Sequence, residues 1–216
     1  MAARKKGGAK KAAPYPVRLN IEYPDRELNH WTSFFRLILI IPIVILLALV
    51  EGGGVGGGDA GYYAIGGAGL LFFPPLLMIL FRKKYPRWWF DWNLELSRFI
   101  DRIALYLSLM DDRYPSTDEQ QSLRLDIDYP NAEKDLKRGL PIVKWILAIP
   151  HYIVLFFLSI AAFIAVVIAW FAILFTGRYP RGLFDFVEGV FRWHMRVSGY
   201  MFLLVTDRYP PFSLSE

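Results

Sequence analysis

Two long apolar stretches divide this chain, and each predicts helices of membrane length. From Leu37 to Phe81 there is no Lys or Arg, and the only acids are Glu51 and Asp59, which bound a glycine-rich break. At about 1.5 Å per residue, the apolar runs on either side of that break each approach the ~30 Å of a hydrocarbon core. The first stretch therefore predicts a transmembrane hairpin at about 34–81.

The second apolar stretch runs from Trp145 to Phe175, and His151 is its only ionisable residue. One crossing needs about 20 residues, so this stretch predicts two short, closely packed helices. We expect a second hairpin at about 141–176, turning near 159–162. The alternative is one strongly tilted helix with an interfacial continuation, because no strong turn residue marks the reversal.

The chain also repeats itself. The octapeptide at 17–24 matches the one at 123–130, which begins 106 residues later. Two further matches recur 94 and 95 residues apart, joining 85–91 with 179–185 and 112–115 with 207–210. These matches predict two tandem parallel repeats, 14–116 and 122–213, each with a strand, a transmembrane hairpin and an interfacial amphipathic helix.

The octapeptides alternate between apolar and polar residues, as in Val17, Leu19 and Ile21 against Arg18 and Asn20. Alternation with a period of two is typical of half-buried strands. Because a lone strand is unstable, we expect the two octapeptides to pair in a small cytoplasmic sheet.

Helical periodicity follows each hairpin, at about 88–109 and 183–205. In both segments a polar stripe recurs on one face, formed by Asp91, Arg98 and Arg102 and again by Asp185, Arg192 and Arg196. If these helices crossed the bilayer, each arginine would cost at least about 2.5–3.5 kcal/mol. We therefore expect them to lie at the membrane interface.

Charge placement predicts the topology. The chain has 25 Lys and Arg against 20 Asp and Glu, and every Lys and Arg lies outside the two apolar stretches 37–81 and 145–175. The positive-inside rule then favours four transmembrane helices with both termini in the cytoplasm. Residues 1–13 are basic and of low complexity, which predicts a disordered arm against anionic lipid.

Composition agrees with a membrane protein and removes most catalytic chemistry. Hydrophobic residues make up 55% of the chain and aromatic residues 17%. The absence of cysteine excludes disulfides, thiolate metal sites and cysteine nucleophiles. The three histidines are far apart in sequence and form no short-range metal motif. The sequence therefore predicts no catalytic, cofactor-binding or metal-binding residue.

Two candidate binding features remain. Basic side chains at the predicted interface could surround the phosphate of a lipid headgroup, namely Arg87, Arg98, Arg102, Arg181, Arg192 and Arg196. Equally, these arginines could pair with Asp91 and Asp185 and hold each amphipathic helix to its hairpin. His151 is a candidate intramembrane polar site, although a neutral histidine bonded to a carbonyl explains it as well.

Four segments carry a resemblance to a known family: 15–24, 140–152, 171–185 and 206–213. In these segments the chain resembles, as two tandem copies, the bacterial membrane family catalogued as domain of unknown function 4389. The resemblance is close in the second half and looser in the first, which departs at the glycine-rich break. It implies a multi-pass protein of the bacterial inner membrane and carries no assigned activity.

These observations predict a non-enzymatic membrane protein of mostly helical fold with minor β-structure. We expect an accessory or scaffold subunit of a larger membrane complex, or a lipid-organising protein. Its expected partners are membrane lipids, anionic at the cytoplasmic face, and other membrane subunits or itself, with no nucleic acid. The alternative is a small homo-oligomeric transporter or channel for lipid or ions, which needs polar pore-lining residues.

Overall fold

The computed structural model describes residues 14–50, 73–117 and 119–215. These residues form, in chain order, β1 (Val17–Ile21), α1 (His30–Leu39), α2 (Ile41–Val50), the π-helical segment η1 (Met78–Arg82), α4 (Arg87–Leu107), β2 (Leu123–Ile127), α5 (Leu140–Leu147), α6 (Ile149–Thr176) and α7 (Arg181–Met201). The predicted basic arm and the glycine-rich break lie outside the described residues, as does most of the apolar run that follows the break.

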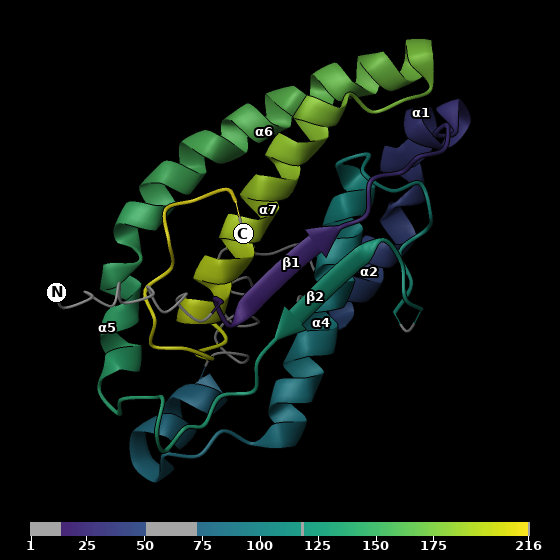
Figure 1. Ribbon diagram of the computed structural model, residues 1–216. Helices are drawn as coiled ribbons and strands as arrows, with labels where there is room; N and C mark the ends of the chain where they lie inside the picture. Colours follow the sequence, from purple (N-terminus) through teal and green to yellow (C-terminus); the bar gives the residue numbers. More distant parts are fainter. Residues whose placement is uncertain (1–13, 51–72, 118, 216) are drawn as a thin grey trace, which may run out of the picture.

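The two octapeptides do pair, so the predicted sheet is confirmed. β1 and β2 are antiparallel, and Leu19 lies directly opposite Leu125, its counterpart in the repeat. Alternate residues of both strands are buried, while the outward row is exposed and polar. Strands of such a small sheet need a covering layer, and α7 and α4 supply it behind the sheet (Figure 1).

Each strand packs on the amphipathic helix of the other half of the chain. β1 lies on α7, where Arg192 Nε donates to the Leu19 carbonyl at 3.0 Å. β2 lies on α4, where Arg98 Nε donates to the Leu125 carbonyl at 3.1 Å. Residues of both halves consequently share one hydrophobic core.

The predicted hairpin at 141–176 is wrong. Helix α6 runs unbroken for 28 residues, and the expected turn at 159–162 lies inside it. No Gly or Pro interrupts this part of the chain, so nothing ends the helix there. The break comes earlier, at Ala148, because Pro150 has no N–H to continue the hydrogen-bond ladder of α5.

The expectation of four transmembrane helices also needs correction. Within residues 14–50, 73–117 and 119–215, α6 alone is long and apolar enough to cross a membrane. The apolar helical stretches His30–Ile45 and Phe73–Arg82 are shorter. Helices α1 and α2 meet at Ile40, two residues before Pro42. Proline thus divides this segment as it divides α5 from α6.

Helix α6 packs along α7, and α1 lies beside it (Figure 1). Gly177 ends α6 in the left-handed conformation, with φ 70°, and its N–H donates to the Ile173 carbonyl at 2.8 Å. The chain then reverses into α7, whose first residue is Arg181. Helices α4 and α7 stand where the sequence predicts helices at about 88–109 and 183–205.

Candidate functional site

A broad apolar surface covers α1, α2, α5 and α6. The most exposed large side chains on it include Trp31 and Leu37 of α1, both 75% exposed, and Phe163 and Phe175 of α6, at 70% and 85%. Soluble proteins rarely expose contiguous apolar surface of this extent. Such a surface is typical of proteins that contact lipid or another apolar partner.

Helix α6 meets the rest of the protein along a single stripe. Its buried residues recur every three to four positions or multiples of that spacing, namely His151, Leu155, Ala165, Ala169 and Ile173. The remaining sides of the helix carry large exposed apolar side chains. Helix α6 thus presents apolar side chains on most of its circumference.

Beneath this surface, an apolar helix in each half of the chain carries a buried cation, and the two cations stand at corresponding positions. Lys144 of α5 is fully buried, and its Nζ lies 2.7 Å from the Thr206 carbonyl and 2.9 Å from a carboxylate oxygen of Asp207. Lys144 also lies over the ring of Tyr200, 4.9 Å from its centroid.

In the first half, Arg36 of α1 takes the same place. Its Nη1 donates to the carbonyls of Tyr106 and, at 2.9 Å, of Asp111, and its guanidinium lies 4.3 Å from the centroid of the Tyr106 ring. The sequence analysis missed both cations. The signal was present, because Arg36 and Lys144 stand 108 residues apart, as Pro42 and Pro150 do.

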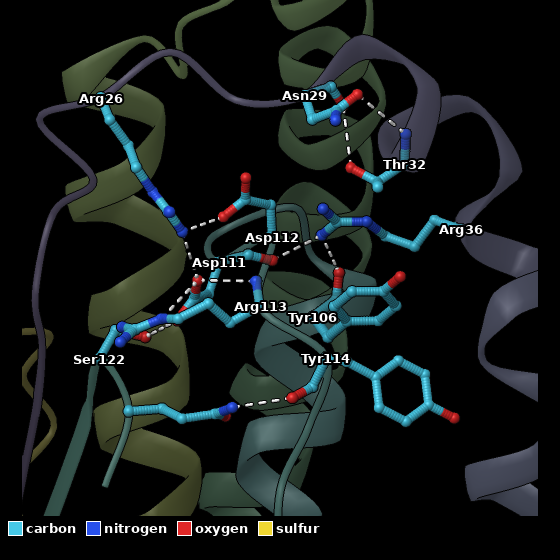
Figure 2. Close-up of polar contacts among 11 residues, drawn as sticks. Arg26, Asn29, Thr32, Arg36, Tyr106, Asp111, Asp112, Arg113, Tyr114 and Ser122 are labelled. Carbon is cyan, nitrogen blue, oxygen red and sulfur yellow. Dashed lines mark hydrogen bonds and ion pairs between the residues drawn. The ribbon is translucent and has the colours of Figure 1, made fainter.

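Figure 2 shows the polar cluster around Arg36, centred on the buried Asp111. Asp111 accepts hydrogen bonds from the Arg113 backbone N–H at 3.0 Å and from the Ser122 hydroxyl at 2.6 Å. Burial alone raises the pKa of Asp111, but the hydrogen bonds from Arg113 and Ser122 outweigh it and hold the pKa below its usual value. This carboxylate is therefore charged and satisfied, which suits a structural role.

A cavity of about 490 Å³ opens beside this cluster, between the end of β1 and the segment after α4. Its lining includes Glu22, Asp25 and Asp111 together with Arg26 and Arg113. Arg26 pairs with Asp112 and lies 3.5 Å from Asp111. Arg113 also pairs with Asp111, at 3.0 Å, so both arginines of the lining are held by aspartates that follow α4.

Two tyrosine–arginine junctions repeat in the structure where each strand meets a helix start. The Tyr23 hydroxyl donates to the Tyr179 carbonyl at 2.6 Å, and Arg181 lies over the Tyr23 ring, 4.6 Å from its centroid. In the other junction the Tyr129 hydroxyl donates to the Tyr85 carbonyl. There Arg87 lies 4.7 Å from the centroid of the Tyr129 ring.

The Arg87 junction borders a second cavity, of about 520 Å³, which has basic residues on its wall. Lys83 and Lys84 line it together with Tyr85, Tyr129 and the segment 130–133. Lys83 follows the apolar helical stretch that ends at Arg82, and its Nζ donates to the Glu133 carbonyl at 3.2 Å. Cationic groups thus gather where an apolar helix ends.

The six arginines predicted at lipid headgroups fall into two groups. Arg98, Arg102, Arg192 and Arg196 each donate to backbone carbonyls, of Leu125, Ser116, Leu19, and Ser213 and Ser215 respectively. Arg87 and Arg181 instead remain exposed over tyrosine rings. The headgroup role of all six stays a prediction, and the exposed pair is best placed for it.

Acidic partners of these arginines were also expected. Arg87 lies 3.6 Å from Asp91, as the sequence suggests. Arg192 pairs at 2.6 Å with Glu188. Arg98 pairs at 2.6 Å with Glu95. The two arginines that donate to the strands therefore each pair with a glutamate of their own helix.

His151 is fully buried among aromatic rings. Its Nδ1 accepts a hydrogen bond from Trp193 Nε1 at 3.0 Å, and its ring stacks on Phe212 with centroids 4.0 Å apart. The partner is thus an indole N–H, whereas the sequence analysis weighed a carbonyl. The Nε2 atom is buried without a hydrogen-bond partner among the described residues. A role for His151 as an intramembrane polar site stays a prediction.

Asp101 is a buried carboxyl that the sequence analysis did not single out. It is 7% exposed, and its Oδ2 has no hydrogen-bond partner in the described part of the chain. Burial raises its pKa to about 7. No group of three or more metal-ligating side chains occurs within 14–50, 73–117 and 119–215.

Comparison with known proteins finds a similarity for one part of the chain. No curated protein and no solved structure matches it. Residues 141–213 match the sequence model of one family, and no second copy is found in the first half. The expected family resemblance is therefore found for one copy, and the expectation of two tandem copies is borne out only in part. The matched region, from α5 to the segment after α7, is similar to the family described as domain of unknown function (DUF4389).

Proposed function

We propose that this chain is a non-enzymatic protein of the bacterial inner membrane that organises anionic lipid or serves as an accessory subunit of a membrane assembly. The observation that carries the proposal is the apolar surface of α1, α2, α5 and α6, since water alone is a poor solvent for it. Apart from the buried Arg36 and Lys144, none of these helices carries a Lys or Arg, and this placement favours both termini in the cytoplasm.

Anionic lipid is the ligand that the rim of this surface favours. Lys83 and Lys84 follow an apolar helical stretch, and Arg87 and the exposed Trp88 begin the next helix. Basic side chains near the membrane surface attract anionic headgroups, and indole rings prefer headgroup depth. A phosphate could be shared by Lys84 and Arg87 without displacing any contact of the buried core.

The experiment is purification of the tagged protein from native membranes in mild detergent, followed by mass spectrometry of co-eluting lipids and proteins. We expect anionic lipid to co-purify, and the double variant Lys84→Gln/Arg87→Gln to retain less of it. Arg124→Gln is the matched control, because Arg124 is an exposed cation on the outward row of the sheet.

The outcomes of this experiment distinguish an accessory subunit from a lipid-organising protein. A foreign subunit in stoichiometric amount establishes the accessory role, while a lone homo-oligomer with bound anionic lipid supports lipid organisation. Equal lipid loss in the double variant and in Arg124→Gln contradicts a local headgroup site. Protein that never fractionates with membranes contradicts the proposal as a whole.

A further inference from the structure

We infer that α6 does not cross the bilayer but lies along one leaflet, with its exposed sides among the acyl chains. The inference rests on the proposed membrane association and specifies its geometry. Length does not decide the matter, because the 28 residues of α6 measure about 42 Å as a helix and suit either arrangement. The elements packed against α6 decide it.

Helix α7 packs against α6 near both ends of α6. Near the start of α6, Leu155 shares a buried cluster with Trp193 and Val197 of α7. Near its end, Ile173 shares the main core with Phe184, close to the start of α7. The two helices are therefore antiparallel neighbours, and α7 would have to enter the bilayer together with α6.

Helix α7 in turn carries the sheet. Arg192 donates to the Leu19 carbonyl at 3.0 Å, and the Ile21 N–H donates to Glu188 Oε1 at 3.0 Å. Figure 1 shows α7 running between α6 and β1. Strand β1 thus follows the middle of α7 and cannot be moved away from α6 without breaking the core.

The outward row of that sheet is polar and open to the surroundings. Arg18 and Asp128 form an ion pair at 2.7 Å while their side chains stay 47% and 55% exposed. Arg124 and Asp126 are exposed beside them. If α6 crossed the bilayer, this row would lie at hydrocarbon depth, where exposed charges and open sheets are not tolerated.

An in-plane position removes the conflict. The exposed sides of α6 and the neighbouring α1 then enter one leaflet, and the sheet faces water on the far side of α7. Trp170 Nε1 donates to the Ser33 carbonyl at 3.3 Å and ties α6 to α1 within one surface. Interfacial helices ordinarily carry their own polar face, and here α7 replaces it.

Labelling of the two ends of α6 tests the inference. The chain has no cysteine, so Arg138→Cys, before α5, and Arg178→Cys, after α6, each introduce a single thiol at an exposed position. A membrane-impermeant maleimide is applied to intact spheroplasts, to inverted vesicles and to detergent-solubilised membranes. We expect both variants to be labelled in inverted vesicles and neither in spheroplasts. Labelling on opposite sides overturns the inference.

Depth gives a second readout. An environment-sensitive fluorophore on Phe163→Cys, at the exposed middle of α6, is quenched by lipids that carry a nitroxide either near the headgroup or at the chain end. We expect the headgroup-proximal nitroxide to quench more strongly. Stronger quenching by the chain-end nitroxide overturns the inference. Asn20→Cys, on the outward row of the sheet, is the control that neither lipid quenches.

The failure of this inference differs from the failure of the proposed function. Protein that survives an alkaline carbonate wash but is labelled on opposite sides remains a membrane protein with a crossing α6. Protein that the wash removes from the membrane contradicts the proposed membrane function, and the in-plane position falls with it.

Discussion

Arg36 and Lys144 occupy corresponding positions in the two halves of the chain, and each is a buried cation held by backbone carbonyls over a tyrosine ring. The carbonyls belong to Asp111 and Thr206, in the segments that follow the amphipathic helices α4 and α7. Each cation thus fastens an apolar helix to the end of the helix that carries the sheet. These contacts link the apolar helices α1 and α5 to the helices that pack on the sheet.

Replacement of Lys144 by alanine is expected to lower the free energy of unfolding by about 3–5 kcal/mol, because Asp207 is left without its buried partner. Lys144→Arg is the matched control, since Arg36 shows that the equivalent site accommodates a guanidinium. Unfolding in detergent micelles, followed by circular dichroism, measures both. If both variants lose the same free energy of unfolding, the site depends on the shape of the lysine side chain and not on its charge.

Gly199 marks the closest approach of α7 to β1. A Cβ at this position would lie 2.6 Å from Val17 Cγ2, so Gly199→Ala is expected to cost about 1–3 kcal/mol. Val17→Ala should recover part of that loss in the double variant. Gly182→Ala, in the first turn of the same helix, meets nothing within 4 Å and should cost nothing. A double-mutant cycle of thermal unfolding with no coupling would argue against this contact.

Asp101 predicts a pH-dependent stability. Its pKa in the folded protein is about 7, well above the usual value near 4, so the native state keeps a proton that the unfolded chain loses. The free energy of unfolding should therefore fall as the pH rises from about 4 to 7, by up to about 4 kcal/mol. Asp101→Asn should flatten this slope and unfold at higher denaturant at pH 8. If the pH dependence of stability is unchanged in Asp101→Asn, a group other than Asp101 causes it.

Arg192 and Arg98 offer a matched pair of variants. Each donates to the carbonyl of the central leucine of a strand, but the Arg192 side chain is 11% exposed and that of Arg98 is 29% exposed. Arg192→Leu is expected to cost about 1.5–3 kcal/mol, and Arg98→Leu less, because water can replace the lost donor more easily. Chemical unfolding of both variants measures the two losses of stability. A smaller loss for Arg192→Leu than for Arg98→Leu would contradict a buried structural role for Arg192.

Local patterns of apolar and polar residues predicted much of the fold. The alternation in 17–24 and 123–130 predicted two strands, and the matching of these segments predicted that they pair. The polar stripes predicted helices close to where α4 and α7 lie. These features depend on residues near one another in sequence, so periodicity reports them. The unbroken α6 corresponds to the single long helix that was only the alternative expectation, because length suggested a reversal that no turn residue supports.

The candidate site was harder to predict. The basic residues at 83, 84 and 87 stand out in sequence, but their gathering with Tyr129 requires β2 to reach the start of α4. The hydrogen bond from Arg192 to strand β1 could not be predicted from the sequence either, because its acceptor is a backbone carbonyl, which every residue possesses.

The sequence by itself determined which segments are apolar, where the two strands and the amphipathic helices α4 and α7 lie, and that thiol chemistry is absent. Tertiary structure alone decided that each strand crosses to the helix of the other half, that Arg36 and Lys144 are buried, and that α6 is bound to a polar layer along its length. The physical reason is that hydrophobic periodicity specifies the face a segment buries, whereas the partner of that face is chosen by long-range packing.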